Sequence, residues 1–222
     1  MDLKNHNLII FGANSYLAKK IIPNLKFNKV ICISKNLKIK KKNVLIFKDY
    51  KNNHLTINKF LKKKTTAIFF NNFSSDNLIF NKNSDELKKE IEGSVINVFE
   101  NARLLCKNLI YNKGGSLIFV GSSRGLSSDV GISGYSIGKN ALIGLMKSFA
   151  VEFSDFGIRS NYLSLGYFDS PLFNKISDNK RLINSTTLKK VGDYKSIVNA
   201  IEFLASSDYV TKSILSVDGG FK

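Results

Sequence analysis

Proline, cysteine and long apolar runs are scarce in this sequence of 222 residues. Two prolines, with fifteen glycines spread along the chain, leave no Pro-rich or Gly/Ser-rich linker, so we expect residues 1–222 to form a single domain. Apolar runs such as LIIF and SLIFV are far shorter than the roughly 20 residues that cross a bilayer, and the chain does not open with a basic segment followed by an apolar one. We therefore expect a cytoplasmic protein without a membrane partner.

The two cysteines stand far apart, Cys32 in a predicted strand and Cys106 in a predicted helix. Without a C-x-x-C pair they indicate neither a metal site nor a disulfide framework, and we expect no metal. We interpret both as small core residues.

Acidic side chains are outnumbered: 34 Lys and Arg against 17 Asp and Glu give a formal net charge of +17. Such a surplus could serve a nucleic-acid partner, because Lys and Arg neutralise phosphates. However, Lys, Asn, Ile and Phe are all abundant, as an AT-rich coding sequence would produce, and the basic runs at residues 38–42 and 62–64 lack interleaved aromatic residues. We therefore expect no nucleic-acid partner.

Short β-branched and aromatic runs alternate with helical patterns along almost the whole chain. We predict strands at residues 7–13, 29–34, 43–49, 66–72, 115–123, 158–166 and 213–220, and helices at 15–22, 55–62, 85–112, 135–156 and 195–206. Near-continuous apolar strands separated by helices are typical of an α/β fold, here a Rossmann-like, doubly wound parallel sheet of about seven strands with helices on both faces. Such sheets bind ligands beyond the carboxyl ends of their strands.

The clearest chemical pattern is Tyr135-Ser-Ile-Gly-Lys139 at the start of a predicted helix, with Ser122 thirteen residues before the tyrosine at the end of a strand. Residues four apart lie on one helix face, so the phenol and the ammonium point the same way. A nearby cation favours the phenolate, so we expect Lys139 to lower the pKa of Tyr135. Ser122 could then hydrogen-bond the same substrate oxygen. Alone, a Y-x-x-x-K pair is common on solvated helix faces.

Several ordered motifs together resemble the short-chain dehydrogenase/reductase family. GANSYLA is similar to the family's GANSGIG turn, NNFSS to NNAG, and VGSSRG with YSIGK to its Ser and Tyr-x-x-x-Lys motifs. IRSNYLSLGYFDSPL resembles IRVNxxxPGxxxTPM, and the carboxyl-terminal segment ends in VDGG as the family's does. The resemblance runs nearly end to end and implies an NAD(P)-dependent oxidoreductase acting on a small-molecule carbonyl or secondary alcohol, built as a homo-oligomer (dimer or tetramer).

By this resemblance Tyr135 is the catalytic acid/base, Lys139 supports it and holds the nicotinamide ribose, and Ser122 positions the substrate carbonyl. Arg124, two residues after Ser122, is placed to touch the substrate or to form a surface pair. The expected cofactor residues follow successive strands: Gly12, Asn14, Ser15, Tyr16, Leu17, Ser34, Lys35, Asp49, Tyr50, Asn72, Phe73, Tyr135, Lys139, Gly166, Phe168 and Ser170.

Three positions depart from the family pattern. The relay Asn of many members aligns with Ser94, which we take as its replacement, although Asn97 one turn later is an alternative. Phe73 stands where the family has Ala, and it either lines the adenosine side or is a core aromatic at a strand end. Leu165 replaces the proline of PG, while Gly166 is retained.

Cofactor choice is indicated by the end of the second strand. NAD sites place a carboxylate there for the ribose hydroxyl, whereas a basic residue accommodates the 2′-phosphate of NADP. The segment CISKN has no carboxylate, and Lys35 follows Ser34, so we favour NADP(H), with NAD(H) as the alternative.

The first turn, FGANSYLA, has one glycine. Gly12 provides the tight turn and Ala18 replaces the third glycine, whereas the middle position falls on Tyr16 or Ser15. Ser15 is a suitable N-cap for a helix beginning at Tyr16. We expect the turn to bind a dinucleotide less tightly than a full-glycine version, because the Tyr16 ring narrows the space near the phosphates.

Two features leave alternatives open. Lys175, Lys180 and Arg181 in the expected substrate-covering segment could meet an anionic group or belong to a solvated loop. The altered turn, Ser94 and Phe73 would also suit a relative that has lost turnover and serves as a binding or scaffolding partner. Retention of Tyr135 and Lys139 favours the enzyme.

Overall fold

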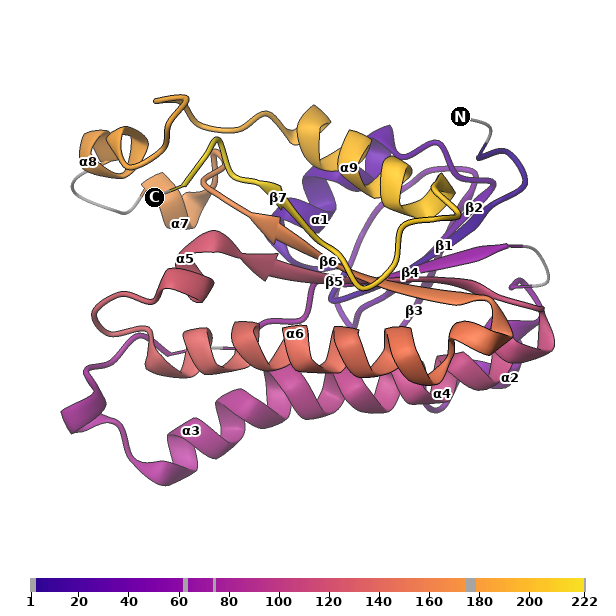
Figure 1. Cartoon of the computed structure of the whole chain (residues 1–222). Helices are drawn as coiled ribbons and strands as arrows, with labels where there is room; N and C mark the ends of the chain where they lie inside the picture. Colours follow the sequence, from indigo (N-terminus) through magenta and orange to yellow (C-terminus); the bar gives the residue numbers. More distant parts are fainter. Residues whose placement is uncertain (1–2, 62–63, 74, 175–178, 222) are drawn as a thin grey trace.

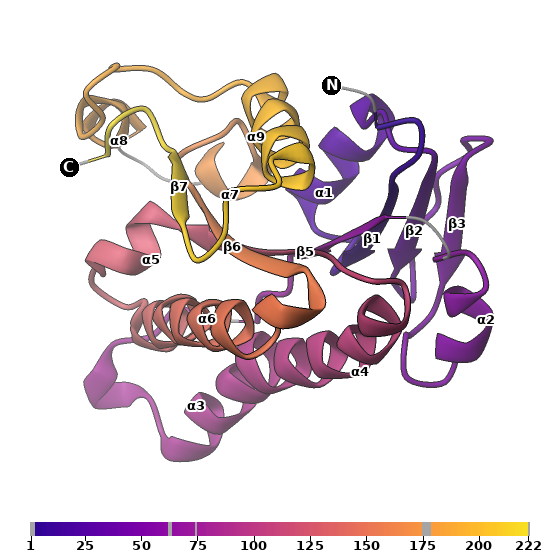
Figure 2. The ribbon, with the colours of Figure 1, turned by 45° about the vertical axis from the view of Figure 1, so that its right-hand side comes forward.

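Seven parallel strands form the centre of the computed structural model, which describes residues 3–61, 64–73, 75–174 and 179–221 (Figures 1 and 2). In spatial order they are β3 (Val44–Phe47), β2 (Lys29–Ile33), β1 (Asn7–Phe11), β4 (Thr65–Phe69), β5 (Gly115–Ser122), β6 (Ile158–Leu165) and β7 (Ile214–Val217). The order reverses beside β1, which pairs with β2 on one side and β4 on the other. The predicted doubly wound α/β sheet is confirmed.

Alternation within each strand divides the core into two layers. In β1, Leu8 and Ile10 pack into the layer under α1 (Tyr16–Ile21) and α9 (Tyr194–Ser206), whereas Ile9 and Phe11 pack into the opposite layer. That second layer is covered by α2 (His54–Asn58), α4 (Asn97–Tyr111) and α6 (Ser133–Glu152), as Figure 1 shows. Burial on both faces explains why the strands read as continuous apolar runs.

The predicted helix at residues 85–112 is interrupted. It begins as α3 (Ser84–Ile91), passes through a π-helical turn (Glu92–Ile96) and continues as α4. Sequence periodicity also missed the short helices α5 (Ser123–Ser127), α7 (Pro171–Asn174) and α8 (Asn179–Asn184). Short 3₁₀ turns lie at Ile22–Asn24, Ile79–Asn81 and Ser154–Phe156.

Among the described residues, no helix is both long and apolar enough to span a membrane. Cys32 lies in β2 and Cys106 in α4; both thiols are buried and free, as predicted.

Candidate active site

A cavity of about 810 Å³ opens at the carboxyl edge of the sheet. Its walls come from the turn between β1 and α1, the ends of β4, β5 and β6, the first turns of α6, and the segment that follows β6. These segments meet where the strand order reverses, which is where an open α/β sheet binds its ligand.

Ser122 and Tyr135 meet within this cavity. Ser122 is the last residue of β5, and its Oγ accepts a hydrogen bond from the Gly125 N–H at 3.3 Å, which caps α5. Tyr135 lies in the first turn of α6 and shares a side-chain hydrogen bond with Ser122. A strand end and a helix start therefore bring together two residues thirteen positions apart.

Lys139 lies one turn further along α6, and only 4% of it is exposed. Its Nζ donates to the Val120 carbonyl at 3.0 Å and lies 5.6 Å from the centroid of the Tyr135 ring. Burial lowers the pKa of Lys139 from its ordinary value to about 8.

The pKa of Tyr135 is raised, because burial of the phenol outweighs the hydrogen bond from Ser122 and the positive charge of Arg124. The expectation that Lys139 lowers the pKa of this phenol is not met. The physical reason is that the ammonium is engaged with the Val120 carbonyl while the phenol is desolvated. Tyr135 is therefore a protonated donor at neutral pH.

The turn after β1 has the predicted form. Gly12 has φ +72°, and a Cβ on it would lie 2.9 Å from the backbone of Phe70, so only glycine fits there. Ser15 caps α1, its Oγ accepting from the Ala18 N–H at 3.2 Å. Tyr16 lines the cavity, and its hydroxyl shares a hydrogen bond with that of Tyr194.

Comparison with known proteins places this geometry in a family. The model of the enoyl-(acyl carrier protein) reductase family matches residues 64–222. The chain belongs to the short-chain dehydrogenase/reductase family.

Individual relatives span the whole chain. The 3-oxoacyl-[acyl-carrier-protein] reductase FabG of Buchnera aphidicola subsp. Schizaphis graminum is 27% identical over 240 residues, covering 99% of this chain and 98% of that protein. A structure of a 4-hydroxyisoleucine dehydrogenase mutant complexed with NADH and succinate superimposes with a TM-score of 0.82 at 26% identity, covering 96% of this chain and 97% of that one. ElxO with NADP bound has the same fold, with a TM-score of 0.84 at 22% identity and coverage of 97% and 98%.

As a short-chain dehydrogenase/reductase, the protein is an oxidoreductase that uses a nicotinamide cofactor. This agrees with the expectation from the motifs, and no comparison favours the scaffolding alternative.

Most of the site residues expected from the sequence line the cavity. They are Ser15, Tyr16, Leu17, Asn72, Ser122, Arg124, Tyr135, Lys139, Gly166, Phe168 and Ser170. Gly12 does not line the cavity but packs against the backbone of Phe70, and Asn14 lies within the turn next to Ser15. Arg124 forms a 3.2 Å ion pair with Asp129, which does not line the cavity, so its side chain makes the surface pair that was the alternative.

The residues expected at the adenine side lie beside this cavity rather than in its wall. Lys35 is exposed just after β2, and the Ser34 hydroxyl accepts from the Asn36 N–H at 3.4 Å. Asp49 follows β3 and accepts from the Asn52 N–H at 2.7 Å. All three lie beyond the carboxyl ends of β2 and β3, where a nucleotide would extend from the cavity.

Two of these expectations are corrected by the packing. Tyr50 is 1% exposed, with its ring edge-on to Phe11 and its hydroxyl donating to Asn58 Oδ1 at 2.9 Å, so its side chain belongs to the core. Phe73 is outside the cavity wall, and its side chain fills the space over Gly93, where an added Cβ would lie 2.6 Å away. Phe73 therefore packs against the π-helical turn, and because 54% of it is exposed it is not a core aromatic either.

Ser94 is buried at the π-helical turn, where its hydroxyl donates to the Glu90 carbonyl at 2.5 Å. It faces Gly138 of α6 and does not line the cavity, whereas Asn97 is exposed. Of the two relay alternatives, only Ser94 lies against the helix that carries Tyr135, but its proton is directed away from the cavity.

Sequence reasoning missed several cavity residues, among them Asp76, Ile132, Tyr167, Phe173 and Phe221. Tyr167 follows Gly166 in a strand-end segment and could have been selected on that position alone. Asp76 and Phe221 come from loops whose course depends on long-range packing. Lys175 lies outside the described residues, and Lys180 and Arg181 in α8 are not in the cavity wall.

Proposed function

We propose that this chain reduces the 3-oxo group of an acyl thioester, with Tyr135 as the proton donor and NADPH as the preferred cofactor. The observation that carries the catalytic part is the meeting of Tyr135 and Ser122 inside the cavity, with Lys139 one helical turn further along α6. The substrate class is supported by full-length similarity to a 3-oxoacyl-[acyl-carrier-protein] reductase.

The cavity residues fit a nicotinamide cofactor. The glycine turn lets the backbone approach closely, and Asn72 and Gly166 follow the strands on either side of β5. When bound, the cofactor supplies the hydride that adds to the carbonyl carbon. Tyr135 then gives its Oη proton to the carbonyl oxygen, on which negative charge develops, while Ser122 holds that oxygen by a hydrogen bond.

Lys139 would hold the cofactor ribose and support the phenol. The Tyr162 hydroxyl donates to the Lys139 carbonyl at 3.2 Å, which steadies this turn of α6 from within the sheet layer. The Nζ bond to Val120 holds the ammonium near Tyr135, where it would be available to a ribose hydroxyl of the cofactor.

The preference for NADPH rests on Ser34 and Lys35, which follow β2 in a segment without a carboxylate. NADH is the second candidate, since the similar 4-hydroxyisoleucine dehydrogenase was solved with NADH. Lys35→Ala should weaken NADPH binding and leave NADH binding unchanged, whereas equal effects on both cofactors would refute the preference.

A two-stage experiment tests the activity. Nicotinamide fluorescence is titrated with NADPH and NADH, and turnover is then followed with acetoacetyl-coenzyme A as the 3-oxoacyl probe. We expect Tyr135→Phe to abolish turnover while keeping the cofactor Kd within about twofold, since the phenol donates the proton without carrying the cofactor. Turnover retained by that variant would refute the role of Tyr135, and reduction of other carbonyls only would refute the substrate class.

We also propose that residues 1–222 act as one cofactor-binding unit in the cytoplasm and assemble as a homo-oligomer through the face of α4 and α6. Exposed apolar side chains on these helices support the assembly: Ile96 precedes α4, Phe99 lies on it, and Ile137 and Val151 lie on α6.

A further inference from the structure

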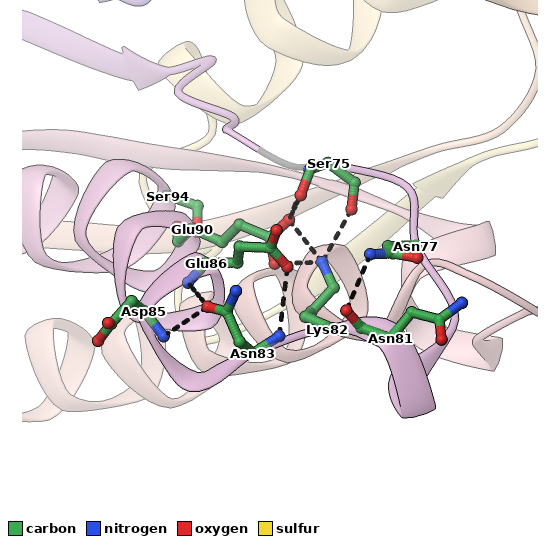
Figure 3. Close-up of polar contacts among 9 residues, drawn as sticks. All are labelled: Ser75, Asn77, Asn81, Lys82, Asn83, Asp85, Glu86, Glu90 and Ser94. Carbon is green, nitrogen blue, oxygen red and sulfur yellow. Dashed lines mark hydrogen bonds and ion pairs between the residues drawn. The ribbon is translucent and has the colours of Figure 1, made fainter.

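A buried ion pair lies behind the catalytic helix, outside the cavity wall (Figure 3). Lys82 Nζ is 2.8 Å from both carboxylate oxygens of Glu90, and the two side chains are only 4% and 1% exposed. Ser75 adds two hydrogen bonds to Glu90 Oε1, from its N–H at 2.5 Å and from its hydroxyl at 2.9 Å. Burial alone would raise the pKa of Glu90, but the bonds from Lys82 and Ser75 lower it, so the carboxylate is ionised.

This carboxylate is pressed against the start of α6. An ideal Cβ on Gly134 would lie 1.5 Å from Glu90 Oε2, and one on Gly138 would lie 2.6 Å from Ser94 Oγ. Gly134 and Gly138 are four residues apart, so they share one face of α6 and form a notch that receives these two side chains.

The notch residues each stand one position before a catalytic residue: Gly134 before Tyr135, and Gly138 before Lys139. Adjacent residues on a helix are rotated by about 100°. Seating Glu90 and Ser94 in the notch therefore fixes the rotation of α6 that turns the phenol and the ammonium toward the cavity.

The same ion pair holds the loop between β4 and α3. Lys82 Nζ donates to the Ser75 carbonyl at 2.8 Å, and the next residue, Asp76, lines the cavity. The Asn77 N–H then donates to the Gly131 carbonyl at 2.9 Å, two residues before α6 begins. Glu90 thus contacts Ser75, which directly precedes the cavity residue Asp76, and also the helix that carries the catalytic pair.

We propose that Glu90, fixed by Lys82 and Ser75, is a positioning residue that sets the rotation of α6 and so the placement of Tyr135 and Lys139. The proposal rests on the proposed function. An apolar pair of similar volume is often as stable as a buried ion pair, so stability alone does not explain the charges. The carboxylate makes directed bonds to Lys82 and Ser75 while its planar edge fits against Gly134.

The first test compares Glu90→Gln with Asp85→Asn. Both neutralise a carboxylate on α3, but Asp85 belongs to an exposed pair with Lys88. With acetoacetyl-coenzyme A, we expect Glu90→Gln to lower kcat by about tenfold to a hundredfold, the size of effect that a misplaced group has. The NADPH Kd should rise by much less than kcat falls, because Lys139 is only one of the residues that would hold the cofactor. Asp85→Asn should retain kcat.

The second test approaches the same contact from α6. Gly134→Ala places a Cβ in the carboxylate, whereas Gly144→Ala, on the same helix, has no atom within 4 Å in the protomer. We expect Gly134→Ala to lower kcat and Gly144→Ala to retain it. The Glu90→Gln and Gly134→Ala double variant should lose little more than the worse single variant, because both break one contact.

Hydrogen exchange at the Asn77 amide provides a readout that needs no turnover, and we expect it to quicken in Glu90→Gln but not in Asp85→Asn. If the wild-type chain reduces no carbonyl, the proposed function fails while this readout still tests the coupling. Wild-type kcat and wild-type Asn77 exchange in Glu90→Gln would overturn the positioning role. Equal losses in Asp85→Asn would overturn it as well, as would a lower melting temperature with an unchanged kcat.

Discussion

Burial shifts the pKa values of Tyr135 and Lys139 in opposite directions. It raises the pKa of Tyr135 and lowers that of Lys139, so each is shifted toward its neutral form. A neutral phenol is the form that donates a proton, which suits reduction of a carbonyl. The charge on Lys139 is correspondingly costly to maintain in the folded protein.

Lys139→Met should expose this cost as a pH-dependent difference in stability. Between pH about 8 and 10.5, the unfolded chain binds a proton at Lys139 that the folded chain has released, so the wild-type free energy of unfolding rises with pH in that window. Relative to the variant, the wild type should gain up to about 3 kcal/mol across it, since one pKa unit corresponds to about 1.36 kcal/mol. Urea unfolding of both proteins from pH 7 to about 10.5 measures the gain. A difference that stays constant with pH would contradict the lowered pKa.

Tyr16 is the residue that most alters the cofactor turn. Its ring is 37% exposed at the cavity wall and is held by the hydroxyl contact with Tyr194, whose own hydroxyl donates to the Asp169 carbonyl. The ring therefore has a fixed place near the expected phosphate site.

Tyr16→Gly should tighten NADPH binding by up to about tenfold, which corresponds to about 1.4 kcal/mol. The reason is that glycine removes the ring that narrows the space near the phosphates. Tyr16→Phe keeps the ring but loses the hydroxyl contact with Tyr194 that holds it, so its Kd should lie between those of the wild type and Tyr16→Gly. Isothermal titration of the three proteins checks this. An unchanged or weaker affinity in Tyr16→Gly would refute the steric explanation.

At the scale of elements, the strands could be predicted from short stretches of sequence, because burial leaves a local apolar pattern. The central strands β1, β4, β5 and β6 were predictable because they are buried on both faces and so have nearly uninterrupted apolar runs, whereas the partly exposed edge strands β3 and β7 were predictable from their short β-branched and apolar runs. The π-helical turn was not, because it depends on contacts from elsewhere: Phe73 against Gly93, and Ser94 against Gly138. Family resemblance placed Tyr50 beside the cofactor, but it could not reveal that a large ring at this position packs against Phe11.

The start of α3 illustrates a local signal that was available but unused. Asn83 Oδ1 accepts from the N–H groups of Asp85 and Glu86, while Glu86 Oε2 accepts from the Asn83 N–H, which forms a capping box (Figure 3). A side-chain cap followed three residues later by Glu is a recognised helix start.

Asn83→Ala should lower the free energy of unfolding by about 1 kcal/mol, because alanine cannot cap the helix. Asn81→Ala is the control: its main-chain carbonyl, which the substitution keeps, is the group that accepts from Asn77. Thermal unfolding of both variants measures the difference. Equal destabilisation at the two positions would show that the capping box does not stabilise α3.

At the scale of the whole molecule, net charge opposes the association of copies, whereas exposed apolar surface favours it. Each chain carries a formal charge of +17, so copies repel one another at low ionic strength. The side chains of Ile137 and Val151 on α6 are nevertheless 44% and 63% exposed, and two such helix faces can bury them against each other. Assembly through this face should therefore depend on how well salt screens the charge.

We expect the oligomer to strengthen as salt rises from about 0.05 M to about 0.5 M, because the Debye length falls from over 10 Å to about 4 Å while apolar burial persists. Val151→Glu should dissociate it, since a carboxylate would be buried in the contact. Leu55→Glu is the matched control, being an equally drastic change of a 72% exposed side chain on α2, a helix that contributes none of the apolar side chains named for the contact. Light scattering across the salt series measures the oligomeric state of each variant. If Leu55→Glu dissociates the oligomer, or if Val151→Glu does not, the contact lies elsewhere.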